Sequence, residues 1–117
     1  MRTARLLIVT ENQNTPDKAV RLAKIIAETL TIQNNSQINK YEKFENSYKI
    51  DFIVEFKEPQ NSIIESLEKT DRICSPWIVR LMRKENKIEL TFNKSTTTTY
   101  ARNEFNVIVW GYWEVGD

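Results

Sequence analysis

The chain of 117 residues has the length of one ordinary domain, and 40% hydrophobic with 28% charged residues is a globular composition, not that of a disordered chain. The formal net charge is +1, histidine is missing, and Gly111 and Gly116 are the only two glycines. Without histidine, Ser-His and Cys-His pairs and most catalytic zinc sites are excluded, and so few glycines exclude glycine-rich phosphate loops.

The N-terminal third predicts a strand followed by a helix. Residues 4–10 contain the continuous aliphatic run 6–9, which indicates a strand that is buried on both faces of a sheet. Thr15 and Pro16 then predict a helix start with a capping hydroxyl and a proline in the first helical position. Apolar residues recur at helical spacing from there, so we expect the helix to extend to about Ile32.

The next third predicts a second strand after a polar, asparagine-rich stretch. Residues 33–46 are either a long loop or a loop with a short irregular element. Residues 48–56 alternate between apolar and mostly charged side chains, which is typical of a strand with one buried and one open face. On this pattern we expect Asp51 and Glu55 to stand on the open face of the sheet.

A second, shorter helix is predicted from Ser62 to about Asp71. The residues from Ser62 to Glu65 match a capping box, in which a hydroxyl and a carboxylate satisfy the free backbone donors at a helix start. The large apolar side chains of this helix are expected to face inward. They are Ile63, Ile64 and Leu67.

Three further strands are predicted over residues 77–83, 88–93 and 105–115. The element order is then β-α-β-α-β-β-β. The simplest arrangement is a single α+β domain spanning residues 1–117, with one five-stranded mixed sheet and both helices packed on one face. The other face would be open to solvent or to a partner.

Cysteine use and hydropathy favour a cytoplasmic protein. The single cysteine, Cys74, cannot close an intramolecular disulfide and has no metal-ligand spacing around it, so we expect a buried thiol in a reducing compartment. The apolar run of residues 6–9 is too short for a signal peptide, and no segment approaches the length of a membrane span. No metal or cofactor site is predicted.

One candidate binding surface is the acidic middle of the sequence. Residues 41–73 carry eight acidic and five basic side chains. Such a surface can steer a basic protein partner and fix its orientation. The candidate contact residues in this segment are Asp51, Glu55, Glu65 and Glu68.

The second candidate surface is an aromatic run near the C-terminus. Trp110, Tyr112 and Trp113 surround Gly111 and are followed by Glu114. Strand alternation sends Trp110 and Tyr112 to one face and Trp113 to the other, so one of the two faces belongs to the core. Exposed Trp and Tyr are preferred interface anchors, and they are also stacking platforms for bases.

The chain resembles the immunity proteins of contact-dependent inhibition and polymorphic toxin systems. The similarity is one of character over the whole sequence: small size, richness in asparagine, isoleucine and lysine, no evident catalytic residues and a mixed α/β pattern. It implies a non-enzymatic, monomeric cytoplasmic inhibitor that binds a cognate bacterial toxin, often a nuclease, one to one. A phage-encoded inhibitor of a host defence has the same sequence character.

The alternative is a small nucleic-acid-binding protein. A cluster of cationic residues in the predicted hairpin region, with Trp77 and Tyr100 nearby, would neutralise phosphates. The near-zero net charge and the lack of a nucleic-acid-binding fingerprint count against this function. The cationic residues are Arg80, Arg83, Lys84, Lys87, Lys94 and Arg102.

Overall fold

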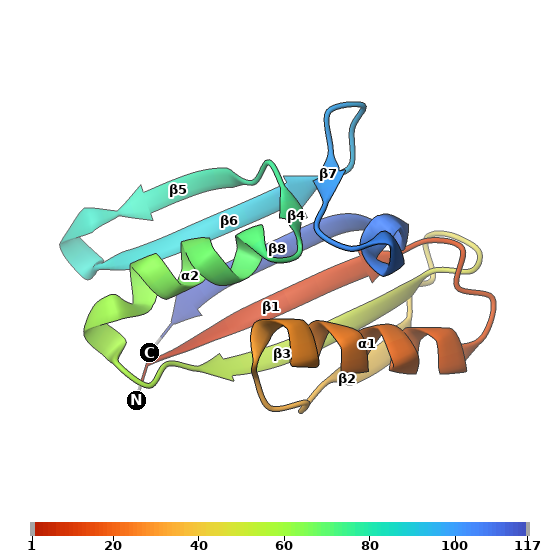
Figure 1. The fold of residues 1–117 in the computed structure, drawn as a ribbon, viewed down its shortest axis with the longest axis horizontal. Coiled ribbons are helices and arrows are strands. Elements are labelled where there is room, and N and C mark those ends of the chain that lie inside the picture. The colour runs from red at the N-terminus through yellow and green to blue at the C-terminus, as the bar shows by residue number, and fades with distance from the viewer. Residues whose placement is uncertain (1, 117) are drawn as a thin grey trace.

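The computed structural model describes residues 2–116. Its large sheet contains β1 (Thr3–Thr10), β2 (Gln37–Lys40), β3 (Tyr48–Glu55), β5 (Ile78–Met82), β6 (Lys87–Asn93) and β8 (Ile108–Gly116). The helices α1 (Pro16–Leu30) and α2 (Ser62–Asp71) both cover the same face of this sheet (Figure 1). A second sheet of two short strands, β4 (Cys74–Ser75) and β7 (Thr99–Tyr100), lies beside it. Three short 3-10 helices complete the described elements: η1 (Pro59–Asn61), η2 (Arg83–Glu85) and η3 (Asn103–Val107).

The strand order in the large sheet is β2-β3-β1-β8-β6-β5, and every neighbouring pair is antiparallel. The α+β class and the placement of both helices on one face are thus confirmed. The expected five-stranded mixed sheet is wrong in two respects, because there are six strands and their pairing is uniformly antiparallel. The sixth strand is β2, which lies inside the stretch 33–46.

The position of β2 explains both differences. After α1 the chain does not form the neighbour of β1 directly. It first forms β2 at the edge of the sheet, and β3 then pairs between β2 and β1. Because β3 closes a hairpin with β2, it runs antiparallel to β1 (Figure 1). Of the four residues of β2 only Ile38 packs against the core, so the sequence shows no alternation of apolar and polar residues there.

The core lies between the sheet and the two helices, and strand alternation selects its residues. In β1, Ala4, Leu6 and Ile8 point toward the helices and are almost fully buried. The neighbouring strands add the large side chains of the core in the same rows, since residues opposite each other in a ladder share a face. These are Ile50, Phe52 and Val54 from β3, Trp113 and Val115 from β8, and Ile88, Leu90 and Phe92 from β6.

Helix α1 begins and ends close to its expected positions. Pro16 is its first residue and Thr15 has extended backbone angles, but the Thr15 side chain makes no capping hydrogen bond. The helix ends at Leu30, and Thr31 follows in the left-handed region with φ 56° and ψ 50°. For a β-branched residue this backbone conformation is strained.

We therefore expect Thr31→Gly to raise the free energy of unfolding. Removing the Cβ relieves the left-handed strain, and after subtraction of the greater freedom of glycine in the unfolded chain the net gain is about 0.5–1 kcal/mol. Urea denaturation followed by circular dichroism measures it. Lys24→Gly, an exposed position inside α1, is the control and should lower stability by about 1 kcal/mol. Equal losses from both changes would contradict the strain at Thr31.

Helix α2 packs on the sheet mainly through hydroxyl side chains, which corrects the expected inward face in part. Ser62, Ser66 and Thr70 are buried. Of the expected apolar residues, Ile63 packs against the core, whereas Ile64 and Leu67 are 66% and 43% exposed. The Ser66 hydroxyl donates to the Ser62 carbonyl oxygen at 2.6 Å, and the Thr70 hydroxyl donates to the Ser66 carbonyl oxygen at 2.8 Å. These bonds satisfy the hydroxyls inside the helix, so small polar residues can occupy the buried face.

The capping box predicted at the start of α2 does not form. Asn61 is the residue before the helix, Ser62 is its first residue, and no side-chain cap forms. The Ser62 Oγ is buried and has no hydrogen-bond partner among the described residues.

Candidate protein-binding surface on the open sheet face

The sheet face opposite the helices, called here the open face, has an apolar centre. In register, Leu7 of β1 lies opposite Tyr112 of β8, and Val9 lies opposite Trp110. The rings of Trp110 and Tyr112 stack with centroids 6.0 Å apart and an interplanar angle of 12°. Both aromatic side chains are half-buried, and Val9 is 5% exposed although no helix covers this face. We call these four residues the aromatic centre.

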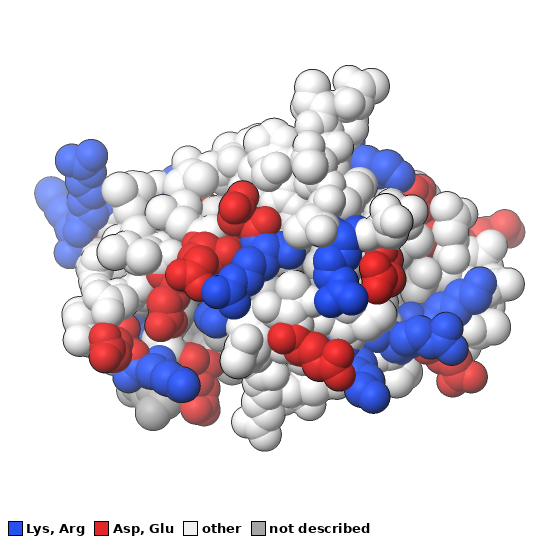
Figure 2. Space-filling view, in the orientation of Figure 1, with Lys and Arg blue, Asp and Glu red and all other residues white. Residues whose placement is uncertain are grey.

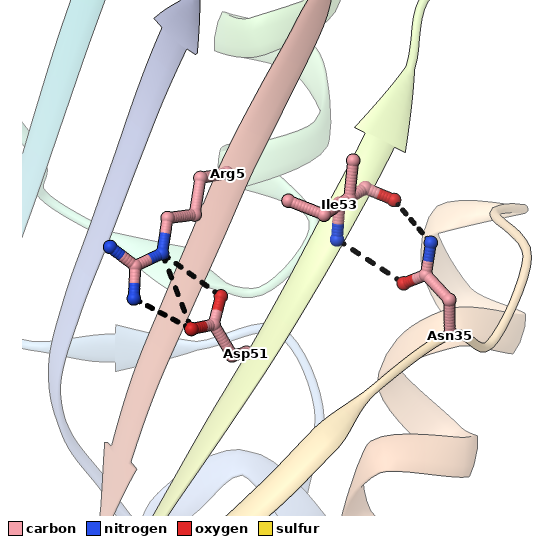
Figure 3. Close-up of polar contacts among 4 residues, drawn as sticks. All are labelled: Arg5, Asn35, Asp51 and Ile53. Atoms are coloured by element: carbon pink, nitrogen blue, oxygen red, sulfur yellow. Dashed lines mark hydrogen bonds and ion pairs between the residues drawn. The ribbon is translucent and has the colours of Figure 1, made fainter.

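A pair of opposite charges lies beside the aromatic centre. Arg5 Nη2 donates to Asp51 Oδ2 at 2.6 Å and Arg5 Nε donates to Asp51 Oδ1 at 3.1 Å, so the pair is bidentate (Figure 3). This hydrogen bond raises the pKa of the Arg5 guanidinium above its ordinary value, with a further contribution from the Asp51 charge. The side chain of Asp51 is only 20% exposed, because Arg5 covers it.

A second charged row crosses the open face through four strands. Across neighbouring strands, Arg5 lies opposite Glu114, Glu114 opposite Glu89, and Glu89 opposite Arg80. Arg80 Nη1 approaches Glu89 Oε2 at 3.8 Å, and the Tyr112 hydroxyl donates to Glu114 Oε2 at 2.6 Å. Burial is the larger cause, and this hydrogen bond to Glu114 the next, of the raised pKa of Tyr112.

Arg5 and Arg80 lie at the two ends of this row and flank Glu114 and Glu89. Without them, the repulsion between the two glutamates would weaken the pairing of β6 with β8. We call Arg5, Arg80, Asp51, Glu89 and Glu114 the charged rim.

Asn35, two residues before β2, extends the pairing with β3 through its side chain. Its Nδ2 donates to the Ile53 carbonyl oxygen at 2.8 Å, and the Ile53 N–H donates to Asn35 Oδ1 at 3.2 Å (Figure 3). The side-chain amide therefore replaces the backbone of an additional β2 residue, since Gln37 is already paired with Asp51 two positions along the ladder.

The structure separates the partner-binding residues expected from the sequence into three places. Asp51, Glu55, Trp110, Tyr112 and Glu114 lie on the open face. Trp113 is fully buried among core residues, so its inclusion as a contact residue is corrected: β-strand alternation turns it toward the helices.

Glu65 and Glu68 stand on α2, on the other layer of the molecule. With the end of β3 and the residues after α1 they line a groove of about 610 Å³. Arg72 Nη2 donates to Glu68 Oε1 at 2.5 Å, and Lys69 Nζ donates to the Leu30 carbonyl oxygen at 2.9 Å. Acidic and basic side chains alternate over this helical face (Figure 2). Glu55, at the end of β3, also lines this groove, whereas Asp51 does not, so the expected acidic residues do not form one surface.

The six cationic residues of the nucleic-acid hypothesis also do not form one surface. Arg80, Arg83, Lys84 and Lys87 lie in and around the β5–β6 turn. At the opposite end of β6, Lys94 Nζ donates to Glu11 Oε1 at 2.7 Å. Arg102 instead binds Glu104 at 3.1 Å and reaches Thr29 of α1.

Trp77 and Tyr100 are packing residues instead of exposed stacking platforms. Both rings contact Phe92, with centroids 5.6 and 6.1 Å from it. Trp77 Nε1 donates to the Cys74 carbonyl oxygen at 2.7 Å, and the Tyr100 hydroxyl donates to the Ile108 carbonyl oxygen at 2.6 Å. Each ring therefore packs on Phe92 and has its polar group already hydrogen-bonded.

Cys74 is buried, as expected. Burial, with a smaller contribution from the charge of Asp71, raises the pKa of its thiol to about 12. The thiol is therefore protonated at neutral pH, and a protonated thiol is a poor nucleophile. Over residues 2–116 there is no group of acidic and cysteine side chains that could hold a metal ion. Within the same residues, none of the helices has the length and hydropathy needed to cross a membrane.

Comparisons of the chain with protein families, with curated proteins and with solved structures gave no match. Its function is therefore inferred from its own surfaces.

Proposed function

We propose that the chain is a non-catalytic, protein-binding inhibitor, and specifically an immunity protein that binds a bacterial toxin domain one to one through the open face. It would act in the cytoplasm as a monomer. The observation that carries this proposal is the aromatic centre, Leu7, Val9, Trp110 and Tyr112, bordered on one side by the charged rim. A phage-encoded inhibitor of a host protein would use the same surface.

The composition of the open face supports a protein partner. Protein interfaces have an apolar centre with aromatic anchors and a polar rim, and a few buried Trp, Tyr or Arg side chains supply most of the binding free energy. Trp110 and Tyr112 are already held by stacking on each other, so little side-chain entropy would be lost on binding. The bidentate pair of Arg5 and Asp51 likewise presents polar groups in a fixed geometry.

The same face fits nucleic acid less well. Phosphate binding requires an excess of positive charge, and among the described residues of the open face the carboxylates balance the cationic side chains. The carboxylates are Asp51, Glu55, Glu89 and Glu114, and the cationic residues are Arg5, Lys49, Arg80 and Lys87. Trp110 and Tyr112 also stack on each other, which leaves fewer ring faces for bases.

The test is titration calorimetry with the product of the gene immediately upstream, which the proposal expects to contain a toxin domain. We expect a one-to-one complex that weakens as salt increases, and Trp110→Ala should weaken it by about 30-fold or more, the loss of one anchor of about 2 kcal/mol. Phe44→Ala is the matched control, because Phe44 is an exposed aromatic residue in the β2–β3 turn, away from the open face. Its affinity should equal that of the wild type.

Two results would contradict the proposal. One is the lack of any complex with that toxin domain at low salt. The other is a complex whose affinity is unchanged by Trp110→Ala, which would place the contact elsewhere. A parallel fluorescence titration with single-stranded and duplex oligonucleotides at low salt tests the alternative, and saturable binding there would favour the nucleic-acid function.

A further inference from the structure

The two edges of the large sheet differ in how they are protected. Edge strands expose unpaired backbone groups, and proteins protect them with short strands, charged residues or covering segments. At one edge β2 has only four residues, with Gln37, Asn39 and Lys40 exposed, and the Asn35 amide extends its pairing with β3. This edge is short and polar.

The other edge, β5, is less protected, since Arg80 is its only charged residue. Its sequence is Ile-Val-Arg-Leu-Met, and Ile78, Val79 and Leu81 are 70%, 48% and 44% exposed. Because β5 is the last strand in the order, its outer backbone groups have no strand partner among the described residues. Helix α2 lies over β6 and β8 and leaves β5 uncovered (Figure 1). Such an exposed apolar edge is suited to pair with another chain.

The surroundings of β5 are basic. Arg80 lies in the middle of the strand, with Glu89 of β6 at 3.8 Å and 73% of its own side chain exposed, and Arg83 and Lys84 are exposed in the turn that follows. Across residues 78–87 there are four basic side chains and one acidic side chain, Glu85. An incoming strand would therefore meet apolar side chains on both faces and positive charge at the middle and at one end.

We propose that β5 binds an extended, acidic and apolar segment of another protein, which adds to the sheet as a seventh strand. This inference goes beyond the proposed function, since it concerns the backbone edge of β5, which β6 separates from the aromatic centre, although Arg80 also belongs to the charged rim. Main-chain hydrogen bonds to β5 would provide affinity, and the side chains on either face would provide selectivity.

The register of β5 indicates what the segment must carry. Arg80 shares the open face with Ile78 and Met82, while Val79 and Leu81 point to the helical face beside Leu90 and Ile88. A carboxylate opposite Arg80 would form a favourable cross-strand pair, and apolar residues would pack beside Val79 and Leu81.

A second copy of this chain fits the edge less well. A two-fold pairing of β5 with itself must place residues of the same face opposite each other. When such a pairing is centred on the strand, the two Arg80 side chains become direct neighbours. The exposed charge therefore favours an acidic partner strand over self-association.

The probe is a fluorescein-labelled, nine-residue peptide that alternates valine with glutamate, titrated with the intact protein at low salt and followed by anisotropy. We expect saturable binding, slower amide hydrogen exchange in β5, and loss of binding when the central residue of the peptide is proline. A peptide that alternates valine with lysine should not bind.

Arg80→Glu is expected to weaken the acidic peptide about tenfold, since it replaces an attractive cross-strand pair by a repulsive one. Lys40→Glu makes the same charge change on the β2 edge and should have no effect. The proposal is overturned if the acidic peptide does not bind, if Arg80→Glu leaves its affinity unchanged, or if the central proline is tolerated. It is also overturned if sedimentation shows a dimer that Val79→Lys dissociates, because the occupant is then a second copy.

Discussion

Trp113→Ala is expected to lower the free energy of unfolding by about 3–5 kcal/mol, the usual cost of removing a large aromatic side chain from a packed core. Trp113 is fully buried, lies opposite Leu6 and Leu90 in neighbouring strands, and meets Phe56 edge to face at 6.3 Å. Its indole N–H has no hydrogen-bond partner among the described residues, so the loss comes from packing.

Urea denaturation of purified variants measures this effect. Trp110→Ala is the matched control, since Trp110 is three residues away in the same strand but on the open face, and it should cost about 1 kcal/mol or less. Trp113→Phe should retain most of the stability. Similar losses for the two alanine variants would show that the faces of β8 are not divided as described.

Gly111→Ala is expected to lower the free energy of unfolding by about 1–3 kcal/mol through overpacking. A Cβ at this position would lie 2.8 Å from Cη2 and 3.2 Å from Cζ3 of Trp77. The indole cannot withdraw easily, because its Nε1 donates to the Cys74 carbonyl oxygen and its ring packs on Phe92. Gly111 does not have a positive φ, so the expected loss is steric.

A double-mutant cycle with Trp77→Phe separates the steric effect from any other. The smaller ring removes the atoms that the new methyl group would meet, so Gly111→Ala should cost less than about 0.5 kcal/mol in that background. An equal cost in both backgrounds would exclude the contact with Trp77 as the cause.

The sequence predicts the elements whose buried face consists of large apolar residues. Helix α1 and strand β3 have such a face, and both are found close to the expected positions. Helix α2 buries Ser62, Ser66 and Thr70 instead, and a pattern based on hydropathy therefore finds Ile63 but wrongly includes Ile64 and Leu67. Strand β2 is too short and polar to be distinguished from a loop, although its hairpin with β3 decides the direction of β3.

The candidate site on the open face could be predicted only where neighbours in sequence determine it. Alternation correctly separates Trp113 from Trp110 and Tyr112, since it depends only on neighbours in sequence. The pairing of Arg5 with Asp51 joins residues 46 positions apart and follows from the ladder register between β1 and β3. Arg5 and Glu89 were therefore missed as members of the charged rim. A count of charges by segment predicts one acidic surface, but Arg5 from a neighbouring strand neutralises Asp51, and Glu68 on the other layer pairs with Arg72.

The strand order also constrains when the domain can fold. β1 lies between β3 and β8, and Thr3 pairs with Gly116. The centre of the sheet therefore remains incomplete until β8 has left the ribosome, and one side of β1 stays unpaired until then. Contacts of such long sequence separation slow folding and prolong the exposure of unpaired strands. The core can therefore be completed only after β8 has been synthesised, and until then chaperones would find β1 unprotected on one side.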